Sequence, residues 1–118
     1  MEADVAYTLF SEQLMRHTPL TVRRGKGGLS YYRHDVFVCH FNARPQQKRD
    51  DLGFADFRYD SLRPHLDVEQ VIAALQRDAL PDVQFKRHKL WATLHFPLTR
   101  IEDVADLFVM HIISKVRI

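Results

Sequence analysis

Two short segments combine cationic and aromatic residues in a way that could bind an anionic, planar ligand. In each segment a basic turn leads directly into a strand that carries Tyr or Trp. Positive charge attracts phosphate groups and aromatic rings stack on nucleobases, so the combination is typical of nucleic-acid binding. Ordinary strands and turns also carry such residues, which leaves a purely structural role open. The candidate binding residues are Arg23, Arg24, Lys26, Tyr31, Arg33, Lys86, Arg87, Lys89 and Trp91.

The formal charge changes sign along the chain in three blocks. Residues 16–49 carry eight Lys or Arg and one acid, a net of +7, and residues 50–83 carry eight acids and three Arg, a net of −5. Residues 84–100 add four bases without an acid, while the whole chain is only +2. If the two basic blocks meet after folding, they form a basic face. The leading hypothesis is therefore a non-enzymatic binding module whose basic hairpin face engages an anionic partner, above all nucleic acid.

Seven histidines and one cysteine raise the question of a metal site or a nucleophile. No two histidines have the three- or four-residue spacing of helical zinc ligands, and Cys39 and His40 are neighbours that point to opposite faces of a strand. Cys39 lies among apolar residues, which predicts a buried thiol. We expect no metal, no cofactor and no catalytic residue. A pocket that combines His40, His95 and Cys39, with the two histidines on neighbouring strands, remains a third hypothesis.

Hydrophobic periodicity predicts the elements that position these residues. Residues 25–28, Gly-Lys-Gly-Gly, lack the spacing of a phosphate loop and predict a hairpin turn. Asp67 with Gln70, and Thr99 with Glu102, have the form of helix capping boxes. The predicted elements are a helix over 4–15, strands over 20–24, 29–33, 35–43 and 52–59, a helix from 67 to Pro81, one or two strands over 83–96, and a helix from 99 onward.

This order predicts the fold class α+β, in which an antiparallel sheet of about five strands has helices packed on one face. The order is α-β-β-β(-β)-α-β(-β)-α, and the chain is expected to be a single domain over 1–118. In the strand over 35–43, alternation places Phe37, Cys39 and Phe41 on one face and His40 on the other. Apolar residues on both faces favour a central position for this strand.

The composition predicts a globular, cytosolic protein that does not contact membranes. Apolar residues make up 46% and charged residues 27% of the chain. The longest apolar runs, such as 36–41, are far shorter than the roughly 20 residues that cross a bilayer. The acidic start of the chain differs from the basic start of a signal peptide, and a single cysteine fits a reducing compartment.

Residues 89–94, Lys-Leu-Trp-Ala-Thr-Leu, and the helix after them resemble the MmcQ/YjbR-like group of small bacterial domains. In that family a basic strand, typically with His directly before Trp, precedes a closing helix. Leu90 stands at the position of that His, and Ser114-Lys115 stands where the family usually has Ser-Tyr. The resemblance covers the last third of the chain. This resemblance implies DNA binding. At the positions that match the family, the residues involved would be Lys89 and Trp91.

The order of elements is also similar to that of type III secretion chaperones, which are homodimers that wrap an extended effector segment and are usually acidic. The alternative function is accordingly a homodimeric protein-interaction or secretion-chaperone-like domain. Its interface would use the strand over 36–41 or the terminal helix, because that helix carries more apolar residues than one core-facing stripe needs. The residues outside the stripe are Leu107, Val109, Met110 and Ile113.

Overall fold

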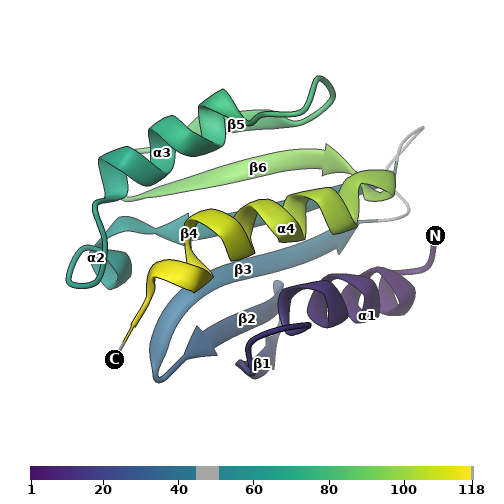
Figure 1. The fold of residues 1–118 in the computed structure, drawn as a ribbon. Helices are drawn as coiled ribbons and strands as arrows, with labels where there is room; N and C mark the ends of the chain where they lie inside the picture. The colour runs from purple at the N-terminus through teal and green to yellow at the C-terminus, as the bar shows by residue number, and fades with distance from the viewer. Residues whose placement is uncertain (45–50, 118) are drawn as a thin grey trace.

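The chain forms a six-stranded antiparallel sheet that is covered on one face by helices (Figure 1). The structure is a computed structural model and describes residues 1–44 and 51–117. The strands are β1 (Thr21–Gly25), β2 (Gly28–Arg33), β3 (Val36–Arg44), β4 (Leu52–Arg58), β5 (Gln84–Arg87) and β6 (Trp91–Pro97). The helices are α1 (Ala3–Leu14), α2 (Tyr59–Leu62), α3 (Val68–Arg77) and α4 (Ile101–His111), with 3-10 turns at Leu98–Arg100 and Ile113–Lys115.

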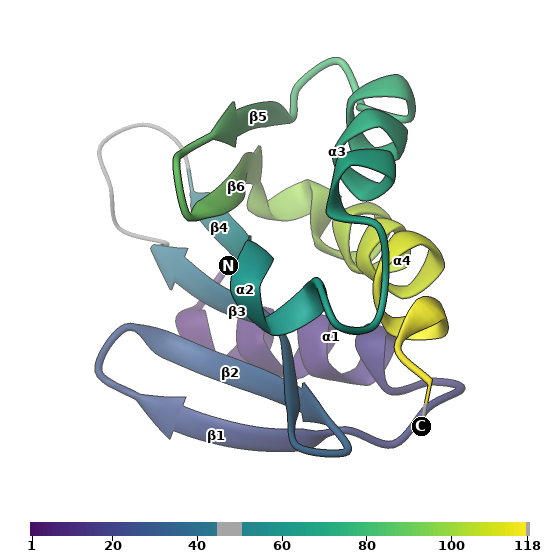
Figure 2. The same ribbon diagram turned by 90° about the vertical axis from the view of Figure 1, so that its left-hand side faces the viewer.

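The order of strands across the sheet is β1-β2-β3-β4-β6-β5, and every neighbouring pair is antiparallel. The chain builds the first four strands in sequence. It then crosses the helical side through α3, reaches the far edge as β5 and returns as β6 beside β4 (Figure 2). The predicted α+β class is confirmed, with six strands instead of about five, because residues 88–90 turn and divide the range 83–96 into two strands.

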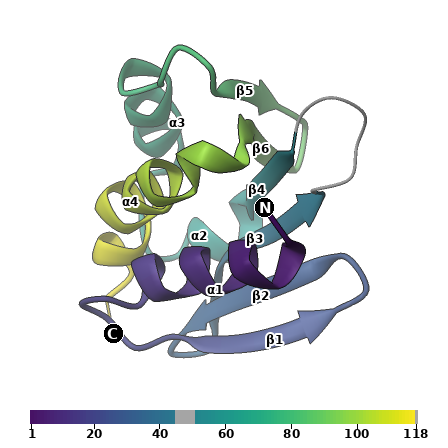
Figure 3. The same cartoon turned by 90° about the vertical axis from the view of Figure 1, so that its right-hand side faces the viewer.

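Helices α1, α3 and α4 lie on the same side of the sheet, and the other side carries no helix along most of its length (Figures 2 and 3). The helical side holds the core. The ring of Phe10 in α1 stacks on Phe41 in β3, with centroids 4.2 Å apart, and Phe108 in α4 packs against Phe57 at 6.1 Å. Such aromatic pairs contribute about 0.5–1.5 kcal/mol each beyond the burial of their area. No helix among the described residues is long and apolar enough to cross a membrane.

Of the two predicted capping boxes, the one at Asp67 is present as its N-cap half. The side chain of Asp67 accepts hydrogen bonds from the backbone N–H groups of Glu69 and Gln70, which begins α3 as expected. The prediction for Thr99 is wrong, because the chain enters a 3-10 turn at the buried Leu98 and Thr99 lies inside that turn. Helix α4 then begins at Ile101 without a side-chain cap.

A β-bulge changes the predicted faces of β3. The register shifts between Tyr31 and Tyr32, so that Tyr31 lies opposite Cys39 and Tyr32 lies opposite Phe37. The extra residue reverses the alternation, and the ring of Phe37 lies 5.6 Å from Tyr32 on the side away from the helices. The prediction that Phe37 shares a face with Cys39 and Phe41 is therefore wrong.

Two backbone positions constrain the sheet. At Gly53 in β4, a Cβ atom would lie 2.7 Å from the ring of Phe96 on the neighbouring strand, so only glycine lets that ring pack flat on the backbone. The turn between β2 and β3 consists of His34 and Asp35, whose φ angles are 50° and 67°. Both values lie in the left-handed region, which favours Asn and Gly over the residues present.

Candidate nucleic-acid interface on the open sheet face

We use the term open face for the side of the sheet that faces away from α1, α3 and α4 (Figure 2). Strand alternation assigns side chains to it, because every second residue of a strand points away from the core. Register aligns these side chains in rows across the sheet, one of which runs Ser30, His40, Asp56, Thr93, Lys86. The polar and aromatic side chains of the open face are Thr21, Arg23, Ser30, Tyr32, Phe37, His40, Asn42, Arg44, Phe54, Asp56, Arg58, Gln84, Lys86, Trp91, Thr93 and His95.

Strands and helices carry opposite charge. The six strands contain seven Arg or Lys and one acid, Asp56, a net of +6. The four α-helices contain seven Asp or Glu and one base, Arg77, a net of −6. The nearly neutral total of +2 therefore conceals strands and helices of opposite net charge.

Three of the strand bases point toward the helices, and two of them pair with carboxylates there. Arg24 lies 3.9 Å from a carboxylate oxygen of Asp4 in α1, and Arg87 makes two hydrogen bonds, of 2.6 and 3.2 Å, to Glu69 in α3. Arg33 donates a hydrogen bond to the backbone carbonyl of Ile113. All three are candidate binding residues from the sequence, and all three instead join the sheet to the helical layer.

The other strand bases lie on the open face, and two of them stack on aromatic rings. The guanidinium carbon of Arg23 lies 4.6 Å from the ring centre of Tyr32, and that of Arg44 lies 4.8 Å from Phe54. Stacking orients a guanidinium flat on the ring and leaves its N–H groups free at the rim to bind phosphate oxygens. Lys86 lies on β5 opposite Thr93, two residues beyond Gln84, which pairs with His95.

The exposed aromatic ring of this face is the indole of Trp91, the single tryptophan of the chain. Trp91 is 39% exposed. One face of its indole stacks on the imidazole of His88, with ring centroids 3.9 Å apart. The hydroxyl of Tyr59 lies 2.8 Å from the carbonyl oxygens of both His88 and Trp91, which fixes the turn between β5 and β6. The indole is therefore stacked and still partly accessible to solvent.

The pKa of His95 reports the positive potential of the open face. It is lowered from 6.5 first by partial burial and then by the charges of Lys86, His88 and Arg44. Each of these groups disfavours a further positive charge on the imidazole. The ring also meets Phe54 edge to face at 4.5 Å. Lys86 from β5 and Arg44 from β3 therefore both act on one histidine of the open face.

The acids near the open face are partly compensated. The carboxylate of Asp56 lies 3.6 Å from Nδ1 of His40, on the neighbouring strand. Asp60, in the short helix α2, lies 3.7 Å from the guanidinium of Arg58. Because Asp56 is the sole acid in the six described strands, the open face remains positive.

The two basic turns do not become neighbours as the sequence hypothesis required. Lys26 lies in the turn that follows β1, whereas Lys89 lies in the turn that precedes β6, and β1 and β6 run in the same direction. The turns are therefore at opposite ends of the strands, and β1 and β5 are opposite edges of the sheet. Positive charge instead continues from one edge to the other across the open face.

Tyr31 is not accessible, contrary to its selection as a binding residue. It is 0% exposed, and its hydroxyl lies 2.7 Å from that of Ser11 in α1. Burial raises the pKa of Tyr31 well above its usual value. The bulge places the following residue, Tyr32, on the open face instead.

Sequence reasoning did not select Arg44 and Phe54 as candidates. The sequence did contain a signal for Phe54. In the strand over 52–58, Phe54 has the same parity as the charged residues Asp56 and Arg58. Shared parity with charged residues predicts the solvent side of a strand.

The hypothesis of one pocket with His40, His95 and Cys39 is wrong. Cys39 is buried on the helical side, where burial raises the pKa of its thiol, while both histidines lie on the open face. The histidines are not on neighbouring strands either, because β4 separates β3 from β6. Within residues 1–44 and 51–117, no group of three or more His, Cys, Asp or Glu could hold a metal ion.

The structure narrows the surfaces proposed for a homodimer. Strand β3 pairs with β2 and β4, so it has no free edge and could meet a second copy only through the open face. In the terminal helix and the turn after it, Leu107 and Ile113 are buried, whereas Met110 is 56% exposed. Helix α4 packs against both α1 and α3, so it has more than one buried side.

Comparison with protein-family models, with curated proteins and with solved structures finds no match for this chain. The resemblance of its last third to MmcQ/YjbR-like domains therefore stays a prediction.

Proposed function

We propose that this chain is a non-enzymatic module that binds single-stranded nucleic acid on its open face. The observation that carries the proposal is that four strand bases, Arg23, Arg44, Arg58 and Lys86, lie on the uncovered side of the sheet together with one strand acid, Asp56. Phosphate neutralisation supplies most of the affinity of such proteins and releases counterions. The MmcQ/YjbR resemblance implies the same class of ligand.

Aromatic residues among the cations favour a single strand over a duplex. The bases of a single strand are free to stack on side chains, whereas those of a duplex are stacked on each other. Tyr32 on β2 and Trp91 on β6 are three strand spacings apart, about 14 Å, which is room for more than one nucleotide. Arg23 and Arg44 lie on rings of the same face, where their N–H groups can reach phosphates between stacked bases.

The test uses the native fluorescence of Trp91. A 12-nucleotide oligo-dT is titrated at 50 mM NaCl, and we expect saturable quenching because a base stacks on the indole. Trp91→Ala should weaken binding of a fluorescein-labelled oligonucleotide about 5- to 100-fold, since stacking contributes about 1–3 kcal/mol per base. Trp91→Phe should retain most of the affinity.

Met110→Ala is the matched control, because Met110 is an exposed apolar residue of the helical layer. It should bind the oligonucleotide like the unaltered chain. The proposal fails if no binding occurs at 50 mM NaCl, if a duplex of equal length binds as tightly, or if Trp91→Ala and Met110→Ala have the same affinity.

A further inference from the structure

Strand β1 is an edge of the sheet with an unpaired side. It pairs only with β2 among the described elements, and all five of its residues are exposed. An edge strand presents a row of main-chain N–H and C=O groups that another extended chain can bind. The opposite edge, β5, is shorter, and Arg87 ties it to α3.

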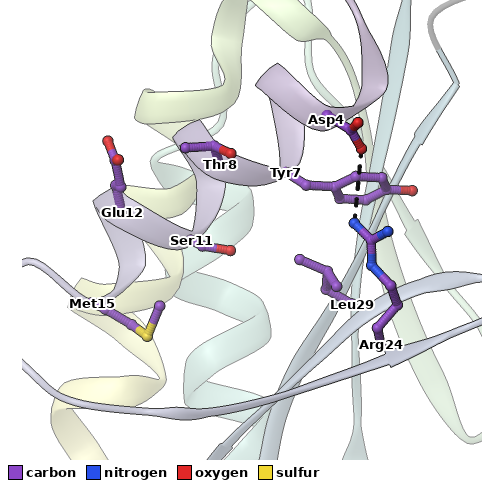
Figure 4. Close-up of a pocket in the computed structure, with 8 residues that line it drawn as sticks. All are labelled: Asp4, Tyr7, Thr8, Ser11, Glu12, Met15, Arg24 and Leu29. Carbon is purple, nitrogen blue, oxygen red and sulfur yellow. Dashed lines mark ion pairs between the residues drawn. The ribbon is translucent and has the colours of Figure 1, made fainter.

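A groove runs beside this edge on the helical side (Figure 4). Helix α1 packs on α4 and β3, and a space of about 380 Å³ lies between α1 and the β1–β2 hairpin. Apolar groups from both sides, Tyr7, Met15 and Leu29, face it, and Arg24 reaches across toward Tyr7 and Asp4 (Figure 4). The lining residues are Asp4, Tyr7, Thr8, Ser11, Glu12, Met15, Arg24 and Leu29.

We propose that an extended, acidic peptide segment of a partner protein adds to β1 as a seventh strand. In this mode of recognition main-chain hydrogen bonds give affinity, and pockets for alternate side chains give specificity. Alternate side chains of the added strand would point into the groove and toward the open face. The inference goes beyond nucleic-acid binding and does not rest on it.

The charged residues on the two faces beside β1 determine which peptide sequence would fit there. On the open side the added strand meets Arg23, which favours Asp or Glu there. On the groove side it meets Val22 and the apolar floor, together with the acids Asp4 and Glu12 of α1, which exclude further acids. The fitting segment therefore alternates acidic and apolar residues.

The same charges disfavour a second copy of this chain as the occupant. Antiparallel pairing of two β1 strands about a two-fold axis would place Arg23 and Arg24 of one copy against those of the other. Like charges opposite one another destabilise a strand pair. Lys26, in the adjoining turn, adds to the repulsion, and residues 20–28 contain no acid. Charge complementarity accordingly selects an acidic partner.

The test uses a capped ten-residue peptide that alternates Glu and Val as the probe, with the full chain labelled with ¹⁵N. We expect saturable changes in the amide shifts of residues 21–25 and slower hydrogen exchange there. A peptide with Lys in place of Glu, and one N-methylated at alternate residues on the pairing side, should each bind at least tenfold more weakly. Shifts at β5 in place of β1, or equal binding of the Glu and Lys peptides, would overturn the proposal.

Charge reversal provides the complementary test on the protein. Arg23→Glu keeps the strand and should weaken binding of the Glu peptide at least tenfold while strengthening that of the Lys peptide. Lys115→Glu, which reverses an exposed cation after α4, should change neither affinity more than twofold. Light scattering is recorded in parallel, because a dimer of the unliganded chain that Arg23→Glu dissociates would identify a second copy as the occupant and refute the acidic peptide.

Discussion

Replacing Gly53 with alanine should destabilise the sheet at the contact between β4 and β6. The added Cβ would lie 2.7 and 2.8 Å from two ring carbons of Phe96 and 3.1 Å from a methyl group of Leu98. Ordinary carbon contacts begin near 3.5 Å, so the ring must move by almost 1 Å. Phe96 is 1% exposed and packs against Phe41 at 6.0 Å, which leaves little space for that movement.

Overpacking of a well-packed core costs about 1–3 kcal/mol. Alanine in place of glycine restores about 0.4–1 kcal/mol through the unfolded chain. The net expectation for Gly53→Ala is a loss of about 1–2 kcal/mol in the free energy of unfolding, which corresponds to a fall of roughly 4–8 °C in Tm for a domain of this size. Urea and thermal denaturation followed by far-UV circular dichroism measure both quantities.

Gly25→Ala is the matched control, since a Cβ at Gly25 meets nothing within 4 Å. Without a clash, Gly25→Ala should show only the gain of about 0.4–1 kcal/mol in the free energy of unfolding that comes through the unfolded chain. Shortening the obstructing ring in the double variant Gly53→Ala, Phe96→Leu should cost less than the sum of the two single changes, because the residues are in contact. If Gly53→Ala is as stable as the unaltered chain, the close approach of the Phe96 ring is not real and the packing argument is refuted.

Lys86→Ala should flatten the salt dependence of oligonucleotide binding, because each phosphate neutralised on a single strand contributes about −0.7 to the slope of log K against log salt. Arg58 is paired with Asp60, so the other three open-face cations, Arg23, Arg44 and Lys86, predict a slope of about −2. The slope of Lys86→Ala should be about −1.4, while Lys115→Ala leaves it unchanged. An equal slope for both variants would contradict this. Lys86→Ala should also raise the pKa of His95, because the substitution removes a neighbouring positive charge that lowers this pKa. NMR titration of the imidazole measures the change. An unaltered pKa would mean that Lys86 does not lie near the imidazole ring. The double substitution His34→Asn, Asp35→Gly should raise the free energy of unfolding by about 1 kcal/mol in urea denaturation, because both residues have positive φ; no gain would mean that side-chain contacts compensate the backbone strain.

Local features of the fold were predictable because they depend on neighbours in the sequence. In β6 the alternation of the apolar Ala92, Leu94 and Phe96 with Thr93 and His95 is enough to assign the core side of the strand. The cap at Asp67 was predictable for the same reason. The bulge in the pairing of β2 and β3 was not predictable, because the sequence of one strand does not show that it has an extra residue relative to its partner.

The candidate surface was less predictable than the fold, because it depends on pairing between distant strands. Nothing local indicates that β6 lies beside β4 and sends β5 to the far edge, yet this arrangement separates Lys26 from Lys89. Whether a basic residue is available also depends on its neighbours in space. Arg23 and Arg24 are adjacent in sequence, but one lies on the open face and the other beside Asp4 in α1.

The opposite signs of strands and helices give the molecule a permanent electric dipole across its thin dimension. A polyanion that approaches from any direction exerts a torque on this dipole, so the protein turns its uncovered side forward before contact. At 0.1 M salt the screening length is about 10 Å, so the rotation occurs only in the last step of the encounter. Association in dilute buffer should accordingly be faster than the small overall charge suggests.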